Sequence, residues 1–262
     1  MSRLSLRPRY QRLAVDEGVD YVEGNFERAF VDWEMDSAEA GLVLIDCWDT
    51  HPIVNHLVRV EEICRDPLAP AAEACRKAGV AVIHAPSPPQ APLYPQWTKY
   101  ASDAELFPQP GEVPEWPPEA FRKKDGDYAQ FAKPAEPVRD AWIEQYTAHR
   151  RIIDTLEPEA EDFVIATGEQ LHRLCRDRGI VHLFFCGFAA NMCVMMRDYG
   201  MREFNRRGYN LILLRDGVTA IEAASTVDTL AMTEAAIVET EMLLGFTLTT
   251  AELISACEEA RG

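Results

Sequence analysis

Four short runs of apolar residues predict strands that are buried on both faces. They occupy residues 41–46 (GLVLID), 80–85 (VAVIHA), 181–187 (VHLFFCG) and 210–216 (NLILLRD). Two weaker runs, at 162–167 (DFVIAT) and 246–249 (FTLT), predict a fifth and a sixth strand. Because the apolar positions are continuous and do not alternate with polar ones, the runs are typical of a parallel sheet covered by helices on both sides.

Helical segments separate these strands, and each has Lys or Arg near its end, followed by glycine. They are residues 70–79, 168–179 and 193–208. This ending is the usual stop signal of a helix. Repeated strand, helix and strand units predict right-handed crossovers and an α/β fold, a three-layer α/β/α sandwich. A chain of 262 residues can form one such domain, so we expect a single domain over residues 1–262.

One region does not fit the repeating pattern. Residues 86–118 hold ten of the seventeen prolines, which remove backbone donors and exclude both helix and central strand. A further helix is expected around residues 136–153. Aromatic side chains argue against disorder in this region. We therefore expect the insertion, residues 86–155, to be a packed lid or an arm in an oligomer. The aromatic residues are Tyr94, Trp97, Phe107, Trp116, Tyr128 and Phe131.

The charge and cysteine content narrow the choice of partners. With 26 basic and 43 acidic residues the formal net charge is −17, which disfavours nucleic acid and membrane surfaces as partners. The charge does not identify a small-molecule substrate, because a local pocket can have the opposite sign. No apolar stretch has the length of a secretory signal or a membrane span. Seven scattered cysteines without a CxxC pair predict free thiols in a reducing compartment, so we expect a cytoplasmic protein. Metal-ligand spacings and nucleotide-binding glycine motifs are missing, so no cofactor is expected.

Two residues at strand ends are candidates for catalysis. Asp46 closes the first strand, at the sheet edge where open α/β folds bind ligands, and could be a general base or a helix cap. Cys193 follows the fourth strand at the start of the next helix, where a thiol pKa is lowered and amides can bind an oxyanion. Its alternative role is that of a buried apolar residue. Four more residues could line a pocket there, or be ordinary loop residues: Trp48, His51, His84 and Tyr128.

Together, these segments resemble the isochorismatase-like cysteine hydrolases, a superfamily that includes nicotinamidases and N-carbamoylsarcosine amidohydrolases. The segment GFAANMCV (187–194) is similar to the family motif G-x-[AS]-T-[ND]-x-C-V. The resemblance implies a six-stranded parallel sheet in the order 3-2-1-4-5-6. It also implies Asp46 as general base, Cys193 as nucleophile and a cis peptide bond at Phe188–Ala189. The amides of Ala189 and Cys193 would then bind the oxyanion. Dimers or tetramers are common in the family, so a homo-oligomer is expected.

The chain departs from the family pattern at its third catalytic position. Thr167 stands where the family has a lysine after the third strand. The segment KKDGDYAQF in the insertion is similar to the missing lysine loop, so Lys124, or its neighbour Lys123, could supply the charge from there. Alternatively, both lysines are solvated loop residues. Trp48 replaces a glutamine common in the family, and Ala190 replaces the motif threonine, so the substrate need not be a known one.

The sequence therefore predicts a cysteine-dependent hydrolase of a small amide, ureido or related C–N bond that forms a thioester-type intermediate. Two alternatives stay open. The loss of the lysine at Thr167 would fit a non-catalytic binding or scaffold protein with the same fold. A vinyl-ether hydrolase, as isochorismatase is, would not need the thiol of Cys193.

Overall fold

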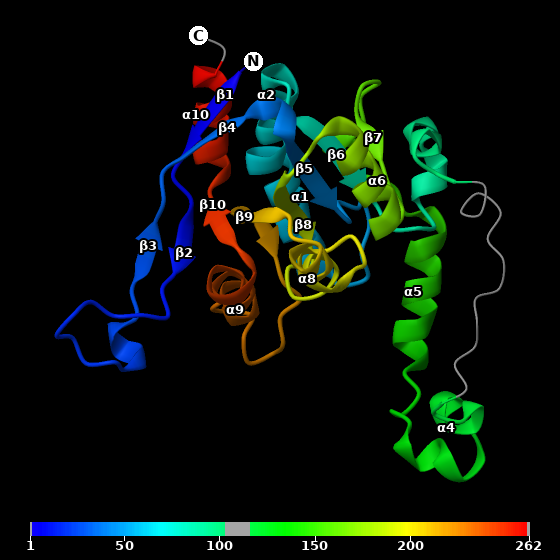
Figure 1. Ribbon diagram of the computed structural model, residues 1–262. Coiled ribbons are helices and arrows are strands. Elements are labelled where there is room, and N and C mark those ends of the chain that lie inside the picture. Colours follow the sequence, from blue (N-terminus) through cyan, green and yellow to red (C-terminus); the bar gives the residue numbers. More distant parts are fainter. Residues whose placement is uncertain (1, 103–115, 261–262) are drawn as a thin grey trace.

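A parallel sheet with helices on both faces forms the body of the computed structural model, which describes residues 2–102 and 116–260 (Figure 1). Its six parallel strands lie in the order β7-β6-β5-β8-β9-β10. Counted along the chain this order is 3-2-1-4-5-6, and the predicted α/β class is confirmed. The strands are β5 (Ala40–Ile45), β6 (Ala81–Ala85), β7 (Phe163–Val164), β8 (His182–Phe188), β9 (Asn210–Thr219) and β10 (Phe246–Leu248).

An N-terminal extension widens the sheet beyond the predicted six strands. β2 pairs antiparallel with β10, and β3 pairs antiparallel with β2, while β1 and β4 form a separate ribbon. Buried Glu241 accepts hydrogen bonds from Arg9 (2.7 Å) and Arg28 (2.9 Å) and so ties this extension to the body. These strands are short and mix polar with apolar residues, so no continuous apolar run predicts them. They are β1 (Arg3–Leu6), β2 (Arg9–Gln11), β3 (Arg28–Phe30) and β4 (Trp33–Asp36).

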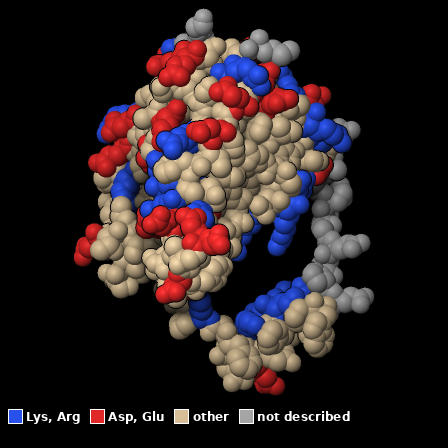
Figure 2. All heavy atoms as spheres, turned by 60° about the vertical axis from the view of Figure 1, so that its left-hand side comes forward, with Lys and Arg blue, Asp and Glu red and all other residues tan. Residues whose placement is uncertain are grey.

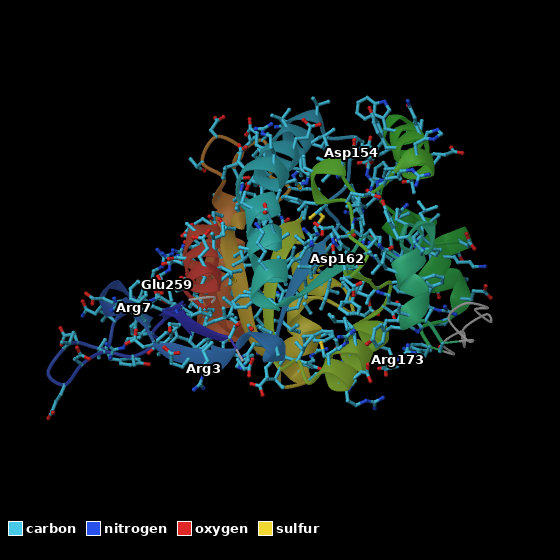
Figure 3. All side chains as sticks on the ribbon, turned by 90° about the horizontal axis from the view of Figure 1, so that it is seen from above. Arg3, Arg7, Asp154, Asp162, Arg173 and Glu259 are labelled. Carbon is cyan, nitrogen blue, oxygen red and sulfur yellow. The ribbon has the colours of Figure 1, made fainter. Side chains whose placement is uncertain are left out.

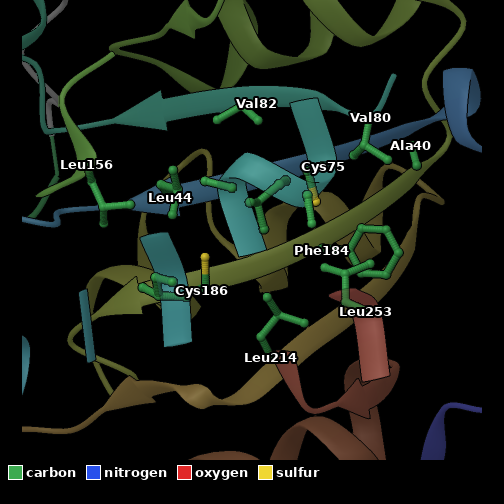
Figure 4. Packing of buried hydrophobic residues seen from close by; sticks show 14 of the residues in the cluster. Ala40, Leu44, Cys75, Val80, Val82, Leu156, Phe184, Cys186, Leu214 and Leu253 are labelled. Carbon is green, nitrogen blue, oxygen red and sulfur yellow. The ribbon is translucent and has the colours of Figure 1, made fainter. Parts of the chain in front are cut away.

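Helices cover both faces of the sheet. On one face, Leu44, Phe184 and Leu214 from three neighbouring strands pack in one cluster with Cys75 of α2 and Leu253 of α10 (Figure 4). A second apolar cluster joins the opposite face to α6, α7, α8 and α9. The helices are α1 (Val54–Ile63), α2 (Ala69–Ala78), α6 (Gly168–Arg178), α7 (Cys193–Met196), α8 (Met201–Arg206), α9 (Ala231–Glu239) and α10 (Thr250–Glu259).

The helix predicted over residues 193–208 is two helices, α7 and α8, with a turn between them. Arg197 leaves the first helix in an extended conformation, and its carbonyl accepts a hydrogen bond from Gly200 (2.8 Å). Asp198 in turn accepts one from the amide of Gly168 at the start of α6 (2.8 Å). A Cβ atom on Gly168 would lie 2.0 Å from the Asp198 carbonyl oxygen, so this close packing requires glycine. The turn fixes the position of Arg197.

The described part of the insertion includes an arm that projects from the body (Figure 1). At its far end, the Phe121 ring packs against the rings of Tyr128 (5.2 Å) and Phe131 (6.3 Å). Residues 103–115, which include the predicted aromatic contact of Phe107, lie outside the described residues. The arm elements are α4 (Glu119–Lys123), the 3₁₀ helix η6 (Gly126–Phe131) and α5 (Pro137–His149).

Two further predictions concern the state of the cysteines and the presence of a membrane span. All seven cysteines are unpaired, and six of them are buried. Within residues 2–102 and 116–260, no helix combines the length and the apolar character needed to cross a lipid bilayer.

Candidate active site

Asp46 lies at the carboxyl end of β5, where it is buried and has a positive φ of 49°. Its Oδ1 accepts a hydrogen bond from the Ser87 hydroxyl at 2.7 Å. Burial raises the pKa of Asp46 to about 6, although its interactions with the thiol of Cys193 and with Ser87 act in the opposite direction. At neutral pH this carboxyl is mainly ionised, and its proton affinity suits a general base.

The thiol of Cys193 lies beside this carboxyl, at the first residue of α7. Burial, and then the negative charge of Asp46, raise the pKa of Cys193 to about 12, while Arg197 acts to lower it. We expected the helix start to lower this pKa. However, α7 has only four residues, and burial together with the neighbouring carboxylate outweighs its amides. At rest, the pair is therefore a protonated thiol beside a carboxylate.

A cation does complete the group, and it is Arg197. Its Nη2 donates to the Ser87 hydroxyl at 3.1 Å and lies 3.9 Å from Asp46 Oδ2. Sequence reasoning missed both Arg197 and Ser87. Thr167, at the position of the family lysine, caps α6 by accepting a hydrogen bond from the Gln170 amide (3.2 Å).

The structure does not bring the lysines of the insertion to this group. Lys124 ends α4 with a φ of 58°, and its Nζ lies 3.6 Å from the centre of the Phe121 ring. Lys123 pairs with Glu119 at 2.6 Å on the same helix. Tyr128 packs on Phe121 and lines no part of the cavity at Cys193. The aromatic contacts hold all of these residues at the far end of the arm.

A cavity of about 700 Å³ opens beside Cys193 and Asp46. Trp48 and His51, two of the predicted pocket residues, line this cavity. Their rings stack on each other with centres 6.4 Å apart. His56, which sequence reasoning missed, also lines it. Burial lowers the pKa of both histidines to about 4, with further lowering by Arg150 at His51 and by His51 at His56. Both imidazoles are therefore neutral at pH 7.

His84 does not line the cavity. Its side chain is buried, and Nε2 lies 3.0 Å from Oδ2 of Asp162, which also accepts two hydrogen bonds from Arg76 (2.7 and 3.0 Å). Figure 3 shows Asp162 within the body of the molecule, far from Arg3 and Arg7 of the N-terminal extension. His84 precedes the last residue of β6, so its side chain lies within the covered face of the sheet, and its role is structural.

The turn between β8 and α7 forms one wall of the cavity. The Phe188–Ala189 peptide bond is cis, as the family resemblance implies. The Ala189 carbonyl accepts from the amides of Met192 (3.0 Å) and Val194 (3.3 Å), and the amide of Ala190 donates to the Thr219 carbonyl (3.0 Å). These three amides are therefore engaged within the protein, and the choice of the Ala189 and Cys193 amides as donors to a substrate oxygen rests on the family resemblance.

In the described part of the chain, no three His, Cys, Asp or Glu side chains gather as a metal site would need. The cationic groups near the thiol are instead guanidinium groups.

Comparison with known proteins agrees with this geometry. The family model for the isochorismatase domain matches residues 41–242, so the chain belongs to the isochorismatase family, a family of hydrolases. A cysteine hydrolase from Pseudomonas syringae pv. phaseolicola 1448A shares the fold, with a TM-score of 0.55 at 18% identity over 87% of this chain and 96% of that one. An isochorismatase family protein from Desulfovibrio vulgaris subsp. vulgaris str. Hildenborough has a TM-score of 0.51 at 15% identity, over 84% and 98%. No curated protein sequence matches this chain.

Proposed function

We propose that the protein hydrolyses a C–N bond of a small amide or ureide, with Cys193 as nucleophile, Asp46 as general base and Arg197 as the cation of the site. One observation carries the proposal: a buried carboxylate lies beside both a thiol and an arginine at the wall of a cavity. Burial of the carboxylate strengthens its electrostatic contacts with these two groups.

The reaction follows from these positions. Asp46 takes the proton of the Cys193 thiol, and the sulfur attacks the substrate carbonyl carbon. The amides of Ala189 and Cys193 donate to the oxygen that becomes negative. When the C–N bond breaks, the leaving nitrogen takes the proton from Asp46, and a thioester to Cys193 remains. Asp46 then takes a proton from water, the hydroxide attacks the thioester, and the released sulfur regains a proton.

Arg197 has the role that Lys124 has in the sequence-based hypothesis. Proton transfer to Asp46 leaves a thiolate, and a guanidinium beside both groups stabilises that negative charge. The hydrogen bond to Ser87 holds the guanidinium in place while the proton moves.

The insertion serves as a lid in this proposal. Trp142 and Ile143 of α5 line the same cavity as Cys193, although both side chains are partly exposed. Closure of α5 over a bound substrate would bury these side chains and exclude water. The second expected role, an arm that joins copies of the chain, would use the exposed aromatic residues at the far end.

A panel of amides, ureides and one vinyl ether tests the proposal, with the wild-type protein, Cys193→Ala and Asp46→Asn. We expect amine or ammonia release by the wild type, none by either variant, and an acyl adduct on Cys193 by mass spectrometry after a rapid acid quench. Vinyl-ether cleavage that survives Cys193→Ala would favour the thiol-independent hydrolase. A wild-type protein that cleaves nothing in the panel and whose thiol resists iodoacetamide at every pH would favour a binding protein.

A further inference from the structure

The cavity carries a charge opposite in sign to that of the whole chain. Its charged lining residues at neutral pH are Asp46, Arg139, Arg150 and Arg197, because its two histidines are neutral. The chain as a whole is strongly acidic, with a net charge of −17. Figure 2 shows Lys and Arg side chains on both sides of the opening between the body and the arm. The excess of positive charge therefore favours an anionic molecule in this cavity.

Two of the three arginines already have partners. Arg197 contacts Ser87 and Asp46, as described above. Arg139 lies within ion-pair distance of Glu136 (3.7 Å) and Asp140 (3.3 Å) on its own helix, and its side chain is largely exposed. Both guanidinium groups are therefore already engaged with side chains of the protein.

Arg150 has no carboxylate partner in the described part of the chain. It is half-buried, and no carboxylate of residues 2–102 and 116–260 lies within ion-pair distance of it. Its buried Nε has no hydrogen-bond acceptor there, which is also true of the Nε of Arg197. A buried donor of a charged group that stays unpaired is costly, and such groups in native proteins normally have a partner. A ligand in the cavity can be that partner.

The guanidinium of Arg150 is also held in one orientation. Its Cζ lies 3.7 Å from the centre of the Trp48 ring. Trp48 is itself fixed, because its indole N–H donates to the Pro86 carbonyl at 2.8 Å and its ring stacks on His51. A planar guanidinium stacked on an aromatic ring leaves its N–H edge free for a planar acceptor, and a carboxylate is the acceptor that matches this fork.

We propose that Arg150 binds the carboxylate of the substrate, so that the enzyme acts on small amides or ureides that carry a carboxylate as a second group. As a statement about substrates, this rests on the proposed function. Apolar side chains such as Ile53 and Met192 line the same cavity and would contact the carbon skeleton between the two groups. The carboxylate at Arg150 would orient the scissile bond toward Cys193.

Binding of two probes to the wild-type protein tests the assignment by isothermal titration calorimetry. The probes are phenylacetate and its neutral counterpart 2-phenylethanol, and neither has a bond that the thiol could cleave. We expect phenylacetate to bind tenfold to a hundredfold more tightly, which is the range for a charge-assisted hydrogen-bonded pair. Arg150→Gln should remove this preference, and Arg150→Lys should keep part of it. Arg151→Gln, at an exposed neighbour outside the cavity, should leave it unchanged.

Equal binding of the two probes, or a preference that survives Arg150→Gln, would overturn the assignment. Tighter binding of benzylphosphonate than of phenylacetate would overturn the choice of a carboxylate. These outcomes do not depend on hydrolysis, so they separate the two proposals. A protein that prefers phenylacetate but cleaves no amide keeps the anion site and loses the proposed function. One that cleaves amides with and without a carboxylate equally well keeps the function and loses this inference.

Discussion

Arg197 and Asp46 share one hydroxyl group. The Ser87 hydroxyl donates to Asp46 Oδ1 at 2.7 Å and accepts from Arg197 Nη2 at 3.1 Å, and the guanidinium lies 3.9 Å from the other carboxyl oxygen. A hydroxyl has only one hydrogen to donate, so the contact with the guanidinium directs that hydrogen to the carboxylate. The three groups therefore hold one another in a fixed arrangement beside the thiol of Cys193.

Removal of the guanidinium should slow the reaction. We expect Arg197→Gln to lower kcat about a hundredfold to a thousandfold, as loss of one electrostatic contact to the reacting groups does. Arg197→Lys should restore part of the rate, because lysine returns the positive charge without the planar guanidinium group. Steady-state kinetics on the best substrate of the panel would measure this. Arg202→Gln is the control, since Arg202 lies on α8 in an exposed ion pair with Glu239. A kcat that falls equally in the control would contradict the assigned role.

The pH dependence of kcat/KM should show one rising limb. Asp46 must be ionised to accept the thiol proton, and its pKa is about 6, so the rate should rise as pH increases through 6. Cys193, with a pKa of about 12, stays protonated until strongly alkaline pH, so a plateau should extend to at least pH 9. Because the hydrogen bond from Ser87 lowers the pKa of Asp46, Ser87→Ala should move the limb to higher pH. A limb that this variant leaves unmoved would exclude Asp46 as its origin.

The parts of the structure that depend on continuous apolar runs are predictable from the sequence. All six parallel strands follow such runs, and Asp46 and Cys193 meet because both follow strands that are neighbours in the sheet. β2 and β3 were missed because strands of three residues that mix polar and apolar side chains form no continuous apolar run. The placement of His84 was wrong because a residue one position before a strand end still faces the covered side of the sheet.

Arg197 shows how a tertiary contact can hide a site residue. The family resemblance implies a lysine at this place, and the sequence pattern predicts one uniform helix over residues 193–208. The available signal was spacing: Arg197 is four residues after Cys193, so the two side chains lie on the same side of a helical turn. What fixes Arg197 in detail is the packing of its turn against Gly168, thirty residues away, and no local pattern encodes that contact.

This packing makes Gly168→Ala an informative variant. In an isolated helix, alanine is more stable than glycine by about 1 kcal/mol. Here the new Cβ would lie 2.0 Å from the Asp198 carbonyl oxygen, so we expect a loss of about 1–3 kcal/mol in the free energy of unfolding, together with a lower kcat as the turn displaces Arg197. Denaturant unfolding and kinetics would measure both. Gly24→Ala, where a Cβ meets nothing within 4 Å, should change neither. A stabilised and fully active Gly168→Ala protein would show that the turn does not position Arg197.

The buried ion network at His84 should affect stability and not chemistry. Burial raises the pKa of Asp162, but hydrogen bonds from His84 and Arg76 outweigh it, and the net pKa lies below the usual range. A carboxyl with a depressed pKa stabilises the fold above its unfolded pKa of about 4, and this stabilisation is lost as pH falls further. We expect Asp162→Asn to cost about 3 kcal/mol of unfolding free energy at pH 7, as breaking a buried pair does, with unchanged kcat.

The pH dependence of Asp162→Asn shows in which direction the charge of Asp162 changes the free energy of unfolding. The difference in unfolding free energy between wild type and Asp162→Asn should shrink as the pH is lowered below 4, because the carboxyl of the unfolded wild-type chain then takes up a proton, while that of the folded protein, with its depressed pKa, stays ionised. Chemical denaturation of both proteins between pH 3 and pH 7 would follow it, with Asp154→Asn, on the 3₁₀ turn Asp154–Leu156, as the exposed control. A difference that stays constant over this range would mean that packing, and not the charge of Asp162, stabilises this corner of the sheet.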